Sequence, residues 1–154
     1  MPDRINMELK DGTVVMELRP DLAPNHVARI KELVSEGFYD GIVFHRVIPG
    51  FMAQTGDPTG TGTGGSDKPN LGAEFSEEFH VRGTVSMARS ASPDSANSQF
   101  FICFTDCAWL NGQYTAFGKV VSGMEYIDAI KKGAEGGNGE VSDPDGIVKM
   151  SLAD

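Results

Sequence analysis

Residues 96–104 read ANSQFFICF, and this stretch decides the fold because it alternates like a β-strand. Successive side chains of a strand point to opposite faces. One face carries Ser98, Phe100, Ile102 and Phe104. This face is apolar beyond its first residue, so we expect it to lie in the core. The other face carries Gln99, Phe101 and Cys103. Phe101 is therefore either covered by another element or forms the floor of a pocket with Gln99 at its rim.

Further strand-like runs flank this stretch, at residues 42–48, 51–55, 83–88, 115–121 and 147–152. The dipeptide Asp11-Gly12 lies between two β-prone runs, which is a strong hairpin signal. One apolar stripe predicts a helix over 24–36, with His26 on its polar side, and GMEYIDAIKKG predicts a second helix over 123–132. Many strands, two helices and frequent glycine turns indicate a mainly β fold, a closed or nearly closed barrel with two helices packed against it.

The stretch FHRVIPGFMAQTGD, at residues 44–57, is mostly apolar but contains Arg46 and Gln54. Arginine is costly to bury and has five donors to satisfy, so its presence in this run indicates a functional role. A third segment, AWLNGQYTAFG at residues 108–118, places the only tryptophan, Trp109, beside Leu110 and ahead of Tyr114. Three separate segments thus offer apolar groups next to hydrogen-bonding groups, which is typical of a ligand pocket.

Composition argues against several classes of protein. The 154 residues, 40% hydrophobic and 23% charged, predict one soluble domain spanning residues 1–154. A net charge of -9 repels phosphate backbones and anionic lipids, so we expect no nucleic acid and no membrane partner. The two cysteines, Cys103 and Cys107, are too few for a disulfide framework, so we expect reduced thiols. The first residues lack the apolar run of a signal peptide, so we expect a cytoplasmic location.

Two apparent ligand motifs fail on their context. Residues 60–65, GTGTGG, have dinucleotide-binding spacing, but Pro69 interrupts the helix that would have to follow. This segment is either a flexible surface loop or one wall of a groove. The three histidines, His26, His45 and His80, lack metal-ligand spacing. We therefore expect no metal, no cofactor and no covalent intermediate.

The motifs FHRVIPGFMAQTGD, GTGTGGS, VSMARS, NSQFFIC and WLNG followed by FGKV resemble, in order and spacing, the cyclophilin-type peptidyl-prolyl cis-trans isomerases. The resemblance runs from residue 5 to residue 152, and the short loops resemble the compact bacterial branch. It implies a closed, eight-stranded antiparallel β-barrel capped by two α-helices, with the active groove on the outer face. It also implies that the partners are proline-containing peptides, unfolded protein chains and cyclosporin-type cyclic peptides, and the short loops suggest a monomer.

Carried over by motif, the resemblance assigns catalysis to Arg46, Gln54 and Phe51. It assigns the substrate groove to His45, Ile48, Met52, Gly62, Ala88, Arg89, Ser90, Gln99, Phe101, Trp109, Leu110 and Tyr114. Arg89 and Tyr114 depart from the eukaryotic members, which have Asn and His there, so we expect altered peptide preference and inhibitor affinity. The alternative to an enzyme is a proline-peptide binding or chaperone module with little turnover, and an isomerisation assay separates the two.

Overall fold

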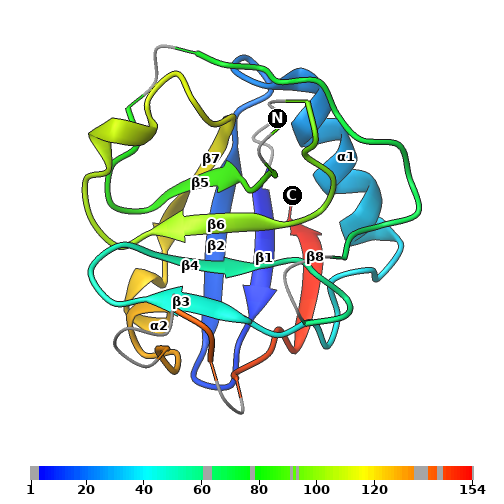
Figure 1. Cartoon of the computed structure of the whole chain (residues 1–154). Helices are drawn as coiled ribbons and strands as arrows, with labels where there is room; N and C mark the ends of the chain where they lie inside the picture. The colour runs from blue at the N-terminus through cyan, green and yellow to red at the C-terminus, as the bar shows by residue number, and fades with distance from the viewer. Residues whose placement is uncertain are drawn as a thin grey trace.

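Eight antiparallel strands form one curled sheet in the computed structural model of the chain (Figure 1). The structure describes residues 4–60, 64–76, 79–90, 92, 94–133, 139–141 and 144–153, apart from the side chains of Trp109 and Ala153. The strands are β1 (Arg4–Glu8), β2 (Thr13–Leu18), β3 (Arg46–Ile48), β4 (Met52–Thr55), β5 (Thr84–Met87), β6 (Phe100–Cys103), β7 (Ala116–Ser122) and β8 (Lys149–Ala153). The helices in these ranges are α1 (Pro24–Ser35), the 3-10 helix η1 (Ala108–Leu110) and α2 (Met124–Asp128).

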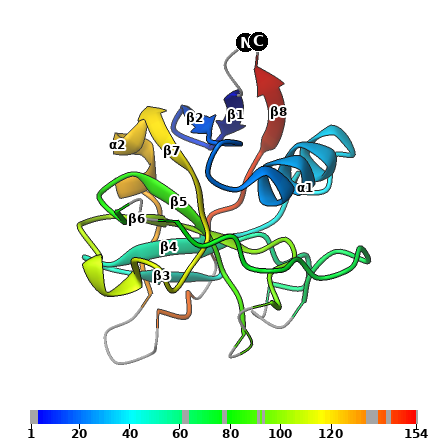
Figure 2. The same ribbon diagram turned by 90° about the horizontal axis from the view of Figure 1, so that it is seen from above.

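The strand order is β3-β4-β6-β5-β7-β2-β1-β8. In one view β3, β4 and β6 run across β1, β2 and β8, and the view turned by a right angle separates the two groups into layers (Figure 1, Figure 2). The sheet is therefore a curled half-barrel whose two halves enclose the core. β1 and β8 pair along their whole length, with Arg4 opposite Ala153 and Glu8 opposite Lys149.

The closed barrel that we expected is not confirmed. β3 and β8 are the two ends of the strand order, and within the described residues only isolated bridges, from Val43 to Gly146 and from Arg46 to Glu140, lie on this side of the molecule. The predicted strand over 42–48 is reduced to three residues, because Val43 forms only a single bridge with Gly146. Arg46 is likewise bridged to Glu140 outside any named strand. A short edge strand with isolated bridges cannot supply the continuous register that closure of a barrel requires.

The two faces of β6 are divided as the alternation predicts. Phe100, Ile102 and Phe104 belong to the large core, whereas Phe101 and Cys103 belong to a second, smaller apolar cluster. In the large core the ring of Phe100 meets the rings of Tyr39 and Phe117 edge to face, at centroid distances of 5.5 and 6.2 Å. This packing fixes one face of β6 in the core enclosed by the sheet, so the other face of β6 points outward.

Helix α1 confirms the first predicted helix almost residue for residue, and α2 is shorter than predicted. α1 packs against β8, and α2 packs against β2 (Figure 2). The α-helical bonding ends just after Asp128: Ala129 still donates to the carbonyl of Glu125, but Ile130 donates to the i-3 carbonyl of Ile127 and Lys131 donates to Asp145. A helix cannot continue once its N–H groups have left the i-4 carbonyls.

The expectation that His26 lies on the polar side of α1 is wrong, because this side chain is fully buried. Its Nδ1 lies 2.5 Å from a carboxylate oxygen of Glu74. The same carboxylate accepts the backbone N–H groups of Asn25 and His26, over 3.2 and 2.9 Å. Glu74 therefore satisfies free donors at the helix N-terminus and covers the histidine at the same time.

Within the described residues, no helix is both long and apolar enough to cross a membrane. The same part of the chain contains no group of three or more histidine, cysteine, aspartate or glutamate side chains placed to hold a metal ion. Cys103 and Cys107 are both buried and free.

Candidate active site

The outer face of β3, β4 and β6 carries a row of side chains that the register fixes. Arg46 on β3 is the cross-strand partner of Gln54 on β4, and Gln54 is the partner of Phe101 on β6. Directly paired residues of antiparallel strands point to the same face. The tight turn between β3 and β4, where Gly50 has a φ of 73°, sets this register. A guanidinium, an amide and an aromatic ring are thus brought side by side.

A small cavity of about 110 Å³ opens next to this row. Its nine lining residues are Arg46, Phe51, Met52, Gln54, Ala88, Arg89, Phe101, Leu110 and Tyr114. All of them are among the residues that the sequence singled out, and they come from four separate segments of the chain. Apolar walls with two guanidinium groups and one amide suit a small apolar group attached to a polar chain.

The floor of the small cavity rests on the second apolar cluster. Met52, Phe101 and Leu110 are packed there with Cys103 and Cys107. Burial raises the pKa of both thiols, so they remain neutral and apolar in character. The cysteines therefore support the cavity as packing groups rather than as nucleophiles.

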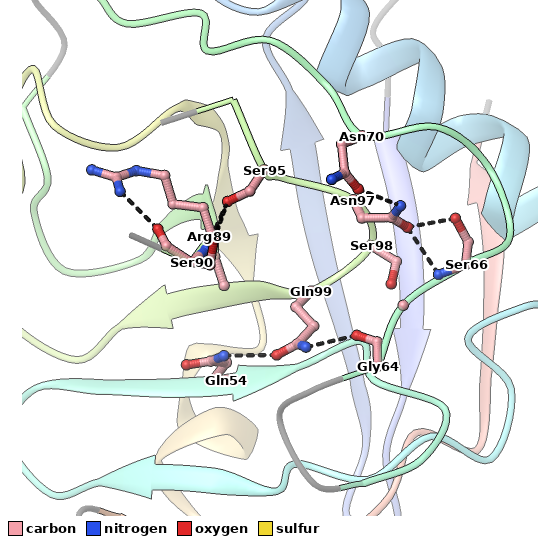
Figure 3. A pocket seen from close by; sticks show the side chains of 12 residues that line it. Gln54, Gly64, Ser66, Asn70, Arg89, Ser90, Ser95, Asn97, Ser98 and Gln99 are labelled. Atoms are coloured by element: carbon pink, nitrogen blue, oxygen red, sulfur yellow. Dashed lines mark hydrogen bonds between the residues drawn. The ribbon is translucent and has the colours of Figure 1, made fainter. Parts of the chain in front are cut away.

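A chain of side-chain amides connects the arginine to the neighbouring loop. Nη1 of Arg46 donates to Oε1 of Gln54 over 3.3 Å, and Nε2 of Gln54 donates to Oε1 of Gln99 over 2.8 Å. Nε2 of Gln99 in turn donates to the carbonyl of Gly64 over 2.8 Å (Figure 3). Each amide accepts on one side and donates on the other, so the direction of the chain and the position of the half-buried guanidinium are both defined.

A larger cavity of about 540 Å³ adjoins the small one, since both are lined by Gln54, Ala88 and Arg89. Its other lining residues are mostly small and polar: Gly64, Gly65, Ser66, Asn70, Ser90, Ser95, Asn97, Ser98 and Gln99 (Figure 3). The Asn97 side chain holds its far wall, because it accepts the backbone N–H of Ser66 over 2.8 Å and donates to the carbonyl of Lys68 over 2.9 Å. Together the two cavities form one groove with an apolar end and a polar end.

Arg89 and Tyr114, the two departures from the eukaryotic pattern, are in contact. The guanidinium carbon of Arg89 lies 4.5 Å from the centroid of the Tyr114 ring. Nη2 of Arg89 also donates to the carbonyl of Gln113 over 2.7 Å. The Tyr114 ring meets Phe101 edge to face, with centroids 5.8 Å apart. Arg89, Tyr114 and Phe101 therefore contact one another in sequence along one side of the small cavity.

The family model described as "Cyclophilin type peptidyl-prolyl cis-trans isomerase/CLD" matches residues 4–152, nearly the whole chain. The chain belongs to the cyclophilin-type peptidyl-prolyl cis-trans isomerases. It is 61% identical over 157 residues to a probable peptidyl-prolyl cis-trans isomerase of Brucella suis, covering 95% of this chain and 80% of that protein. It is 46% identical over 127 residues to peptidyl-prolyl cis-trans isomerase B of Bacillus subtilis, covering 81% of this chain and 88% of that one.

The fold of this cyclophilin-type isomerase also matches solved structures. A cyclophilin of Cryptosporidium parvum superimposes with a TM-score of 0.91 at 29% identity, covering 100% of this chain and 99% of that chain. A second crystal structure of that protein, in the presence of the dipeptide Ala-Pro, superimposes with a TM-score of 0.90 at 29% identity, covering 98% and 99%. The family and the isomerase activity that the motifs imply are confirmed.

The remaining predicted residues of this cyclophilin-type isomerase do not all reach the groove. Ile48 packs against the second apolar cluster. His45 is buried and lines neither cavity, and burial lowers the pKa of its ring. Gly62 and the side chain of Trp109 lie outside the described residues.

Sequence reasoning missed the far wall of the polar cavity, above all Ser66, Asn70 and Asn97. The signal was present in part, because Asn97 directly precedes the strand stretch that decided the fold. Short polar side chains in loops are common, however, and their bonds join segments that are 31 residues apart. The alternation within one strand gives no information on such contacts.

Proposed function

We propose that the small apolar cavity binds the proline ring of an X–Pro segment and that Arg46 is the catalytic donor. Peptide C–N rotation has a barrier of about 18–20 kcal/mol because resonance gives the bond partial double-bond character. In the twisted transition state this resonance is lost, and the lone pair returns to the prolyl nitrogen. That nitrogen becomes a better hydrogen-bond acceptor than it is in either planar isomer.

A donor that faces the prolyl nitrogen therefore stabilises the twisted state more than the ground states, and such differential stabilisation is catalysis. The guanidinium of Arg46 suits this role because it is always charged and its donors lie in a fixed plane. The observation that carries the proposal is its position, at the edge of the apolar cavity and bonded to Gln54 over 3.3 Å. Acceleration on the order of 10⁵-fold needs about 7 kcal/mol, and no step transfers a proton or requires a cofactor.

We infer that the rest of the peptide runs along the groove from the apolar cavity into the polar one. The residues shared by the two cavities, Gln54, Ala88 and Arg89, are the natural contacts for the chain on either side of the proline. The Cryptosporidium parvum relative was crystallised in the presence of Ala-Pro, which supports a proline-containing ligand here as well. Physiological substrates would be unfolded chains whose folding is limited by X–Pro isomerisation.

The decisive test measures isomerisation of a short Ala-Pro peptide by exchange NMR, with wild-type protein and with Arg46→Ala. We expect a folded variant with turnover reduced by about 10²- to 10³-fold and with peptide affinity nearly unchanged, because the contact strengthens only in the twisted state. Wild-type turnover in folded Arg46→Ala would refute the mechanism. Peptide binding without acceleration by the wild-type protein would favour the binding-module alternative.

A single domain over residues 1–154, a monomeric state and a cytoplasmic location remain predictions.

A further inference from the structure

A buried histidine lies behind the aromatic floor of the small cavity. His80 precedes β5, and its side chain is only 1% exposed. Its ring stacks on that of Phe101, with the centroids 6.4 Å apart and the planes 19° apart. Phe101 is therefore held from two directions, by His80 in a stacked contact and by Tyr114 edge to face.

The hydrogen bonds of His80 define its tautomer. Oδ1 of Asn111 lies 2.7 Å from the backbone nitrogen of His80 and 3.1 Å from its Nδ1. A backbone N–H can only donate, so the Asn111 atom is an acceptor and must be the amide oxygen. Nδ1 must then carry the ring proton that it donates to this oxygen. In the neutral ring Nε2 is consequently the acceptor, and the hydroxyl of Ser86, 2.9 Å away, donates to it.

The environment keeps this ring neutral. Burial lowers the pKa of His80, and the bond with Asn111 only partly opposes this effect. Protonation would turn Nε2 into a donor, so the bond with Ser86 would have to reverse. Cys107 is a titratable residue nearby, and its backbone N–H donates to the His80 carbonyl over 2.7 Å. Burial raises the pKa of that thiol, so Cys107 stays neutral too.

The side-chain contacts of His80 reach Phe101, which lines the small cavity, and Ser86 and Asn111, which lie next to lining residues. Ser86 on β5 is the cross-strand partner of Phe101 on β6. Asn111 directly follows η1, which carries the wall residue Leu110. One imidazole thus connects the strand that bears the floor with the segment that bears a side wall. These connections fix the width of the cavity, because each bond allows little change in length.

We propose that His80 is a positioning residue of this isomerase. As a neutral imidazole protonated at Nδ1, it holds Phe101 and the segment of Leu110 at the separation that the twisted proline ring requires. The inference rests on the proposed role of the small cavity. His80 touches neither substrate nor the reacting atoms and acts only through Phe101 and Asn111.

The test compares two buried histidines by exchange NMR, which separates turnover from peptide affinity. His80→Phe keeps an aromatic ring but loses both side-chain bonds. His26→Phe, in α1 and bonded to Glu74, is the matched control for lost stability. At a temperature where both variants are folded, we expect turnover at saturating peptide to fall about 10- to 100-fold in His80→Phe and less than about twofold in His26→Phe, because small misplacements in a site cost large factors. Wild-type turnover in folded His80→Phe overturns the proposal.

If His80→Phe does not fold, His80→Gln replaces it, since its amide oxygen can still accept from Ser86 while the stacked ring is lost. The same loss of turnover is expected, and wild-type turnover again overturns the proposal.

A second measurement reads the tautomer directly from the ring nitrogens of ¹⁵N-labelled protein. We expect a neutral His80 with the proton on Nδ1 near pH 7, and a proton on Nε2 or a charged ring would overturn the proposal.

In Asn111→Asp the new carboxylate should raise the midpoint of His80 titration, since an opposite charge favours the protonated form. An unchanged midpoint would show that residue 111 does not contact Nδ1. Inactive wild-type protein with the expected tautomer would refute the proposed function, whereas active wild-type protein with active His80→Phe would refute only this inference.

Discussion

Arg46 and Gln54 face each other across β3 and β4, and Nη1 of the arginine donates to Oε1 of the glutamine over 3.3 Å. Because the Gln54 amide also donates to Gln99, its oxygen cannot turn away from the arginine without breaking a second bond. The neutral amide oxygen of Gln54 therefore helps to orient the guanidinium at the edge of the small cavity.

The first prediction concerns the neutrality of that acceptor. Gln54→Glu should lower turnover by about tenfold or more, because a carboxylate next to Arg46 would draw the guanidinium into an ion pair and away from the prolyl nitrogen. It would also remove the bond that Nε2 of Gln54 donates to Oε1 of Gln99. Turnover of an Ala-Pro peptide measured by exchange NMR checks this, with the exposed Gln113→Glu as the control for added charge. Equal activity of the two variants would contradict the prediction.

The second prediction separates two adjacent phenylalanines. Phe100 is 1% exposed in the main core, so Phe100→Ala should cost about 3–5 kcal/mol of the free energy of unfolding. Phe101 packs in the smaller cluster and has one side on a cavity, so Phe101→Ala should cost less stability but most of the turnover. Urea denaturation of both variants gives the free energies of unfolding, and the exchange assay gives their turnover. If Phe101→Ala were the less stable protein, the assignment of the two faces would be wrong.

The third prediction is that cyclosporin-type cyclic peptides bind in the groove, but more weakly than to members with Asn and His in place of Arg89 and Tyr114. The structure gives a reason for the weaker binding. The Arg89 guanidinium lies over the Tyr114 ring and is bonded to the carbonyl of Gln113, so the two residues act as one rigid rim of the groove. The double variant R89N/Y114H should bind more tightly, by about 5- to 150-fold, the equivalent of one or two good contacts. Titration followed by fluorescence of Trp109, the only tryptophan, measures this affinity. Unchanged affinity would exclude both residues as determinants.

The fourth prediction concerns acid. Burial lowers the pKa of His26 in spite of Glu74, and it also lowers the pKa values of His45 and His80. The folded state therefore favours neutral rings, and the unfolded chain binds more protons below about pH 6.5, the ordinary histidine pKa. The contribution of the neutral histidines to the free energy of unfolding is complete above that pH. It is lost as the pH falls through the lowered pKa values of the folded state. Urea denaturation should give a smaller free energy of unfolding at pH 5 than at pH 7.5, and His26→Asn should show a weaker dependence. Equal stability at both pH values would contradict the burial argument.

Local patterns predicted the parts of this molecule that local geometry controls. The period of two in residues 98–104 assigned Phe100 and Phe101 to opposite faces, and the stripe on α1 predicted its bounds. Closure of the barrel could not be predicted in this way, because it depends on whether distant edges meet over a full ladder. The burial of His26 was missed because its cover, Glu74, lies 48 residues away in the sequence.

The candidate site follows the same division. All nine residues of the small cavity were in the predicted set, because their motifs are specific and mostly contiguous. The support behind them was not predicted: His80 appeared only as one of three scattered histidines, and its bonds reach Asn111, 31 residues further on. Support of this kind depends on pairs of side chains that no single segment reveals.

The pairing of β1 with β8 has a consequence for how the chain matures on the ribosome. β1 is synthesised well before β8, one of its two neighbours in the sheet. Until β8 has left the exit tunnel, β1 has an unpaired edge, and such edges are prone to aggregation. Completion of the sheet therefore waits for the synthesis of β8. A nascent chain stalled before Lys149 should show proteolytic sensitivity in β1 that disappears once β8 has emerged.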